Sequence, residues 1–265
     1  MTLSLRLLAG AILASLVALA ALRAHALSRS GSVAAFIVGT AAVAAGWAWA
    51  VVLLAFFLSS SALSRWRKQL KDAATRSTVE KGGARDAWQV FANGGVFTVA
   101  AVGQLLHADP RWGLAAVAAL AAATADTWAT EVGTAIGGQP RRILDWHPVL
   151  PGTSGAVSVA GTVAMCAGAA FVGTVAATAS FPLWMVAPVI VGGIAGALFD
   201  TVAGATIQER RWCRVCQRAT ERRVHDCGTL TTHSGGIAHM ANDVVNLTSC
   251  ITGACVALAW WSVTT

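Results

Sequence analysis

The chain is built mainly of apolar runs that are each about as long as a membrane-spanning helix. A helix needs roughly 20 predominantly apolar residues to cross the hydrocarbon core of a bilayer, and such runs recur from residue 3 to residue 262. Only 12% of the residues are charged, whereas soluble domains carry about 25%. We therefore predict an all-α, polytopic transmembrane helical bundle with about seven to eight spans.

The predicted spans are separated by short polar segments. They cover residues 3–22, 31–45, 46–64, 87–107, 112–136, 156–179, 183–207 and 235–262. The stretch 31–64 is compatible with one long span or with two spans that break at Gly46. The first run is interpreted as a retained span rather than a signal peptide, because Arg6 is the only early basic residue. No segment between spans is long enough for a soluble core, so residues 1–265 are predicted to form a single membrane domain.

Lysine and arginine gather in three segments, which are residues 59–86, 138–155 and 208–234. Basic residues favour the cytoplasmic side of a membrane, and a break at Gly46 places all three segments on that side. We therefore predict a protein of the inner or plasma membrane whose three basic segments face the cytoplasm. No basic stripe alternates with aromatic residues, so a nucleic-acid partner is not expected.

Four acidic residues lie in or at the edge of these apolar spans: Asp126, Glu131, Asp200 and Asp243. A charge inside a membrane costs a few kcal/mol and is usually functional, and the spans offer hardly any lysine or arginine as partners. On an ideal helix Asp126 and Glu131 are about 140° apart. We therefore expect Asp126 to share a metal ion with acids from other helices, and Glu131 to hold a second ion or a neighbouring helix.

The chain also has polar and glycine residues near the same helix ends that suit phosphate chemistry. Mg²⁺ prefers carboxylate and amide oxygens together with phosphate oxygens, and cations or glycine-rich turns can bind phosphates. The candidates for nucleotide or phosphate binding are Lys81, Arg85, Asn93, Gly152, Thr153, Ser154, Asn242 and Asn246. Two structural alternatives stay open: the glycines at 82–83 form a flexible loop, and the turn at 151–155 leads into a capped helix.

Cysteines form a spaced set in the segment 208–234, which we predict to be a cytoplasmic loop. Cys213, Cys216, His225 and Cys227 could bind a structural Zn²⁺, with His233 as an alternative fourth ligand. The other interpretation is a set of reduced thiols in a tight loop, since disulfides are disfavoured in the cytoplasm.

Several motifs together resemble one family of integral membrane proteins. They are, in order, "SGSVAAFIVGT", "FFLSSSALSRW", "QVFANGGV", "ADTWATEVG", "PGTSGAVS", "DTVAGATIQ" and "NDVVNL". The family contains the plant phytyl-phosphate kinases and many uncharacterised bacterial and archaeal members. It is distantly similar to dolichol kinases, phytol kinases and phosphatidate cytidylyltransferases. The Cys/His set is absent from the plant pattern.

The resemblance implies a lipid kinase that converts an isoprenoid monophosphate, such as phytyl or polyprenyl phosphate, to the diphosphate. CTP or another NTP and Mg²⁺ would be required, with Asp126, Asp200 and Asp243 as catalytic metal ligands and Glu131 as a further one. Two alternatives stay open, a cytidylyltransferase acting on a lipid phosphate and a transporter that uses the intramembrane acids. The prenyl chain length, the preferred nucleotide and the oligomeric state are left open.

Overall fold

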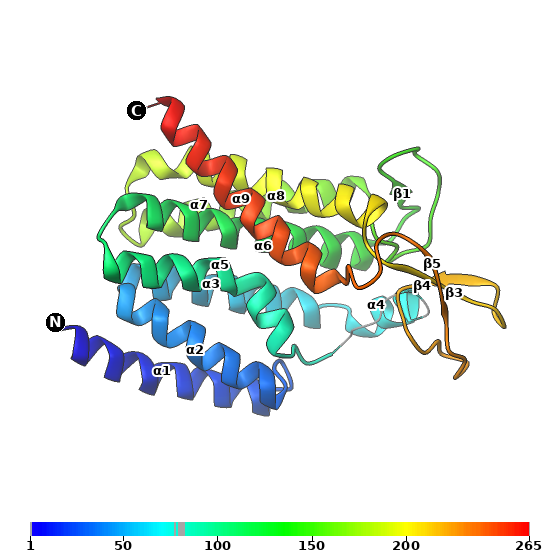
Figure 1. The fold of residues 1–265 in the computed structure, drawn as a ribbon, viewed down its shortest axis with the longest axis horizontal. Helices are drawn as coiled ribbons and strands as arrows, with labels where there is room; N and C mark the ends of the chain where they lie inside the picture. The colour runs from blue at the N-terminus through cyan, green and yellow to red at the C-terminus, as the bar shows by residue number, and fades with distance from the viewer. Residues whose placement is uncertain (1, 77, 79–82, 265) are drawn as a thin grey trace.

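A computed structural model describes residues 2–76, 78 and 83–264 of the chain. The described residues form a helical bundle with two small sheets at one end (Figure 1). The α-helices are α1 (Leu3–Arg23), α2 (Arg29–Ala45), α3 (Trp47–Arg65), α4 (Lys68–Thr75), α5 (Ala87–Leu106), α6 (Pro110–Ile136), α7 (Val159–Thr178), α8 (Val186–Thr206) and α9 (Asn242–Thr264). A 3-10 helix, η1 (Leu183–Met185), precedes α8.

The bundle confirms the prediction of a polytopic helical membrane protein. In the part of the chain that the structure describes, six helices are long and apolar enough to cross a membrane: α1, α3, α5, α7, α9 and the unit formed by η1 and α8. Of the other two predicted spans, α2 is apolar but only 17 residues long, and α6 lies at the centre of the bundle. The sequence predicts seven to eight spans, whereas the structure has about six helices that could span a membrane.

The chain breaks at Gly46, as the split of residues 31–64 requires. Gly46 ends α2 and begins α3 with a φ of 152°, which residues with a side chain rarely adopt. The two helices then pack against each other.

The predicted start of the last span, at residue 235, is wrong. Strand β5 (Thr232–Gly235) occupies this position, and α9 begins only at Asn242. The intervening residues are tied to the end of α8, since the Ile237 N–H donates to the Ile207 carbonyl and the Glu209 N–H donates to the Met240 carbonyl. The segment is apolar enough to extend the span pattern, but its hydrogen bonds tie it to the end of α8.

Helix α6 is the core of the bundle. Every residue from Gly113 to Ala125 is buried, and the helix contacts α3, α4, α5, α7, α8 and α9. Most of these residues are alanine, and small side chains allow helices to approach closely in lipid. The acids Asp126 and Glu131 follow directly after this buried stretch.

The closest helix contacts give a test of this packing. At Gly196 in α8, an added Cβ would lie 2.5 Å from the Ala122 Cβ and 2.7 Å from the Ser249 carbonyl oxygen. The variant Gly196→Ala should therefore lose about 1–3 kcal/mol of stability, measured as a lower thermal midpoint in detergent. Gly95→Ala is the matched control, because an added Cβ there meets nothing within 4 Å. Equal midpoints for the two variants would contradict the close approach of α6, α8 and α9.

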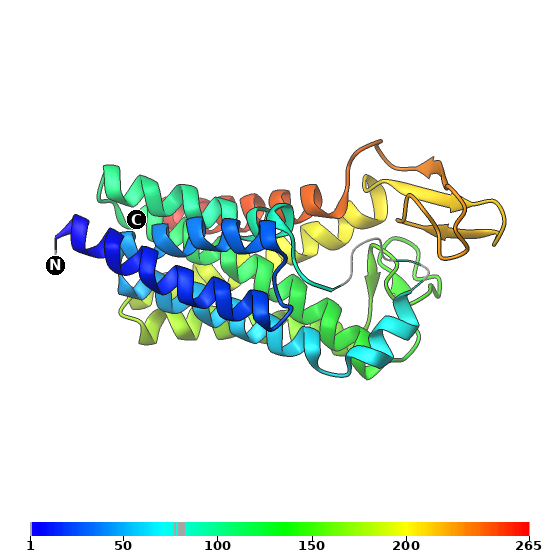
Figure 2. The ribbon, with the colours of Figure 1, turned by 90° about the horizontal axis from the view of Figure 1, so that it is seen from below.

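The polar segments gather at the end of the bundle opposite the two termini (Figures 1 and 2). Helix α4 lies there with a two-stranded sheet of β1 (Arg141–Arg142) and β2 (Ala156–Val157). So does an antiparallel sheet in the order β4-β3-β5, where β3 is Arg210–Cys213 and β4 is Arg218–Thr220. The three basic segments thus lie at one end, as the topology prediction requires, and their cytoplasmic location stays a prediction.

Candidate functional site

A polar cavity of about 1080 Å³ lies among the helix ends on the side of the sheets. Residues of α3 to α9 and of the connections that follow α1, α4, α6 and α8 line it. The predicted site residues among them are Arg85, Asn93, Asp126, Glu131, Gly152, Thr153, Ser154, Asp200, Asn242, Asp243 and Asn246. Lys81, which was also predicted, lies outside the described residues. The fold thus brings residues far apart in the sequence to one space.

Three carboxylates reach the cavity from three different helices. Asp126 lies on α6, Asp200 on α8, and Asp243 in the first turn of α9. The charge of Asp200 interacts with those of Asp126 and Glu221. The Oδ2 atom of Asp200 is buried and has no hydrogen-bond partner among the described residues. A buried anion without a partner is costly, so this set of oxygen ligands suits a hard divalent cation such as Mg²⁺.

Glu131 has a different environment from these three acids. Its carboxylate forms an ion pair with Lys71 of α4 and accepts a hydrogen bond from Ser64 Oγ at 2.6 Å. The Lys71 Nζ also donates to the Leu63 and Ser64 carbonyls, at 2.7 and 3.1 Å. Of the two roles expected from the sequence, the contacts favour the one in which Glu131 holds a neighbouring helix. Its role as a metal ligand stays a prediction.

Arg85 places a half-buried positive charge in the cavity wall. Its guanidinium lies within 3.5 Å of the hydroxyls of Ser61 and Ser64. Burial lowers the pKa of Arg85, and the nearby Glu131 opposes this shift, but an arginine remains protonated in proteins. The Arg85 backbone is fixed by hydrogen bonds with Ala26 and Ser28. A cation fixed in this position suits an anionic ligand such as a phosphate.

The turn at residues 151–155 is packed against the end of α8. Gly155 is buried with a φ of 77°, and an added Cβ would lie 2.4 Å from the Ala205 Cβ. Ser154 Oγ donates a hydrogen bond to the Glu221 carboxylate. The helix that follows is capped by another residue, Ser158, whose hydroxyl accepts from the Gly161 N–H. Ser154 is therefore not used as the helix cap, and its contact with phosphate stays a prediction.

Several cavity residues were not predicted from the sequence. They come from α4 and from the segment around the three-stranded sheet: Lys68, Lys71, Arg211, Glu221, Arg222 and Arg223. In the sequence, the lysines and arginines of this set indicate only membrane topology. Only the tertiary fold shows that these residues also face the cavity.

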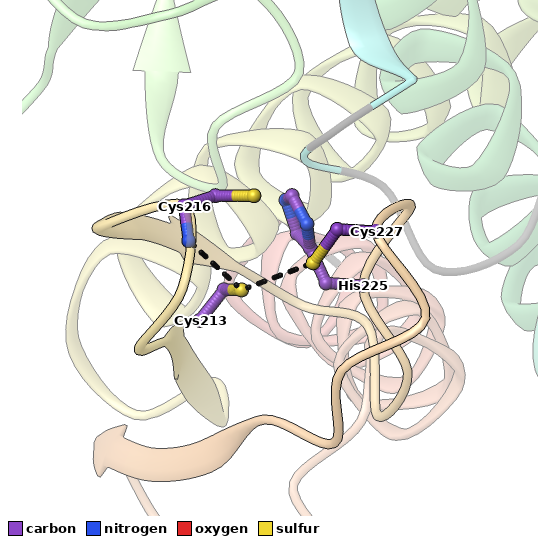
Figure 3. Close-up of side chains that lie close together, drawn as sticks. All are labelled: Cys213, Cys216, His225 and Cys227. Carbon is purple, nitrogen blue, oxygen red and sulfur yellow. Dashed lines mark hydrogen bonds between the residues drawn. The ribbon is translucent and has the colours of Figure 1, made fainter.

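A second cluster lies outside the cavity, in the three-stranded sheet and the loops beside it (Figure 3). The ligand atoms of Cys213, Cys216, His225 and Cys227 all lie within 4.8 Å of one another. The Cys213 and Cys227 sulfurs are 3.6 Å apart, and the Cys216 N–H donates to Cys213 Sγ at 3.4 Å. This Cys₃His set could bind a metal such as Zn²⁺. His233, the alternative ligand, is an exposed residue of β5 and is not part of the set.

The protonation of the cluster also suits metal binding. Hydrogen bonding with Thr229 lowers the pKa of the Cys227 thiol to about 6. Hydrogen bonding with Cys227 raises the pKa of the Cys216 thiol to about 11. A thiolate is the form of cysteine that binds metals, and the lowered pKa of Cys227 favours this form.

Comparison with known proteins identifies relatives over most of the chain. A family model described as "Integral membrane protein DUF92" matches residues 12–254. Protein PGR of Arabidopsis thaliana is 30% identical over 272 residues, which cover 92% of each chain. An uncharacterised membrane protein of Methanocaldococcus jannaschii is 30% identical over 62% of this chain and 67% of its own length. A similar protein of Synechocystis is 35% identical over 46% of this chain and 48% of its own. No solved structure matches the chain.

Proposed function

This chain belongs to the DUF92 family of integral membrane proteins, and from this membership and its polar cavity we propose that it is a nucleotide-dependent lipid kinase. The substrate is an isoprenoid monophosphate, such as phytyl or polyprenyl phosphate, and the product is the diphosphate. CTP is the expected phosphoryl donor. The observation that carries the proposal is the convergence of three carboxylates from three helices with buried and exposed cations in one cavity.

The charges of the cavity support phosphoryl transfer. Such reactions depend almost entirely on positioning and on neutralisation of charge. Asp126, Asp200 and Asp243 would hold Mg²⁺, which supplies charge neutralisation at the nucleotide phosphates when bound. Arg85 would bind phosphate oxygens in the same cavity, with Lys81 as a second proposed cation.

Two amides complete the proposed nucleotide site. Asn242 and Asn246 are one helical turn apart in α9 and both line the cavity. Their side chains can orient ligand oxygens and do not add charge.

The proposed reaction balances without a general base. An oxygen of the lipid monophosphate attacks the γ-phosphorus of the nucleotide, and the bond between this phosphorus and the oxygen bridging it to the β-phosphate breaks. The products are the lipid diphosphate and a nucleoside diphosphate. The attacking oxygen belongs to a group whose second pKa is about 6, so it is already anionic at neutral pH.

The apolar part of the cavity suits a lipid tail. Met165 on α7 and Leu198 on α8 line the cavity, and Leu198 is 42% exposed. A tail lying along these helices would keep its phosphate at the polar end. This arrangement supports a substrate that stays in the bilayer and reacts at the cytoplasmic face.

The proposal is tested with the purified chain in detergent, supplied with phytyl or geranylgeranyl phosphate, Mg²⁺ and each NTP in turn. We expect a lipid diphosphate and a nucleoside diphosphate, detected by mass spectrometry, and no product when EDTA is present. Release of pyrophosphate with a CDP-lipid product would instead identify a cytidylyltransferase. Uptake of a solute into proteoliposomes without any nucleotide, and no product across the lipid panel, would identify a transporter.

A further inference from the structure

The Cys₃His cluster encloses the segment that supplies part of the cavity wall. Cys213 and Cys216 precede strand β4, and His225 and Cys227 follow it. Between the two pairs lie Glu221, Arg222 and Arg223, all of which line the cavity. Any ion held by the four side chains would therefore fix both ends of this segment.

We propose that Cys213, Cys216, His225 and Cys227 bind one zinc ion, which clamps residues 217–224 and holds their charged side chains against the polar cavity. Tetrahedral zinc with Zn–S distances of about 2.3 Å places ligand sulfurs roughly 3.8 Å apart. The 3.6 Å between the Cys213 and Cys227 sulfurs agrees with this spacing. The sulfurs and the imidazole also point toward a common space (Figure 3).

The His225 ring gives independent support for a ligand in this cluster. His225 is only 5% exposed, and among the described residues neither of its ring nitrogens has a hydrogen-bond partner outside the cluster. Burying polar atoms without partners costs free energy. Zinc coordination by one nitrogen would remove most of this cost.

The composition of the sheet also indicates a metal. Among the described residues from 210 to 235, the buried ones are Cys213, Thr220, His225 and Thr231, so no large apolar side chain forms a core. The three strands have four, three and four residues. A sheet of this size cannot stabilise itself by apolar burial, and small units of this kind use metals or disulfides. A metal is the form of stabilisation that this ligand set provides.

The clamped segment contacts two separate walls of the cavity. Glu221 accepts from Ser154 in the 151–155 turn, and its N–H donates to the Thr78 carbonyl at 2.9 Å. The Arg222 guanidinium donates to the Arg76 carbonyl at 2.9 Å. These hydrogen bonds connect the residues after β4 to the end of α4 and to the turn beside α8. Loss of zinc should loosen both contacts.

The first experiment measures metal content of the full chain purified in detergent. We expect close to one zinc per chain by elemental analysis, and less than a tenth of that in Cys216→Ser. Cys166→Ser is the matched control, because Cys166 is an exposed cysteine of α7 outside the cluster, and it should keep its zinc. Wild-type protein without zinc, or Cys216→Ser with full zinc, would overturn the proposal.

The second experiment uses wild-type protein, so that it does not depend on the folding of a variant. Zinc is removed with a chelator and restored, and hydrogen exchange is followed by mass spectrometry. We expect exchange in residues 217–231 to become at least about tenfold faster without zinc and to recover on reloading, with α6 unchanged. Unchanged exchange in this segment would overturn the clamp.

The effect on nucleotide binding rests on the proposed function, whereas zinc content and exchange do not. Removing zinc should weaken binding of a fluorescent CTP analogue by about tenfold, the loss expected when one or two charged contacts are lost. A protein that holds zinc and protects residues 217–231 but binds no nucleotide supports the clamp and contradicts the kinase proposal. The two inferences therefore fail separately.

Discussion

Replacing Asp200 with asparagine should reduce Mg²⁺-dependent diphosphate formation by on the order of 10²–10³-fold. Asparagine has nearly the same shape, so the helix packing is kept while the negative charge is lost. The Oδ2 atom of Asp200 is buried without a partner, and its charge interacts with that of Asp126. Initial rates measured over a range of Mg²⁺ concentrations should show both a lower maximum and a higher Mg²⁺ requirement.

A second measurement separates lost catalysis from lost folding. Without Mg²⁺, the Asp200→Asn variant should melt at the same or a higher temperature than the wild type, because a buried unpaired charge has been removed. Asp145→Asn is the control, since Asp145 lies in an exposed loop and pairs with Arg142. An Asp200→Asn variant with the wild-type rate and Mg²⁺ dependence would contradict the assignment of this carboxylate to the metal.

Replacing Lys71 with alanine should destabilise the protein by about 3 kcal/mol. The Lys71 side chain is 8% exposed and pairs with Glu131, whose side chain is 22% exposed. Its removal leaves this carboxylate without its cation and removes a donor to the Leu63 and Ser64 carbonyls. The loss should appear as a lower midpoint of thermal unfolding in detergent.

Two further variants make the Lys71 prediction specific. Lys71→Met combined with Glu131→Gln should recover more than half of the lost stability, because no unpaired charge is left. Lys68→Ala removes an exposed lysine from the same helix and should leave the midpoint unchanged. If Lys71→Ala melts like Lys68→Ala, the ion pair does not hold α4 to α6.

The helices were predictable because their signal is local. Apolar runs and the glycine at position 46 are visible within a few residues, and they place the helix ends to within a few positions. The sheet of residues 210–235 was not predictable in this way. Its strands are short, and their buried residues are Cys213 and Thr220 in place of alternating apolar side chains. Residues 235–241 contain no Lys, Arg, Asp or Glu, so the last span was predicted to begin seven residues too early.

The candidate site was predictable only for those residues whose type is unusual in their sequence surroundings. Acids in apolar spans are conspicuous, and the angular separation of Asp126 and Glu131 indicated different neighbours. The structure places Asp126 near Asp200 and Glu131 against Lys71. The pairing of Lys71 with Glu131 could not be predicted, because a lysine in a basic segment is explained equally well by membrane topology. Only the tertiary contacts between distant segments show which residues pair.

The central position of α6 has a consequence for the order in which the molecule is made. Its neighbours α3, α4 and α5 leave the ribosome before it, whereas α7, α8 and α9 leave after it. The alanine surface of α6 therefore stays partly uncovered until the C-terminal helix arrives. That same helix brings Asp243 and Asn246 to the cavity. The core and the site are therefore both completed when α9 is synthesised. A nascent chain that stops before α9 has an incomplete core and an incomplete site.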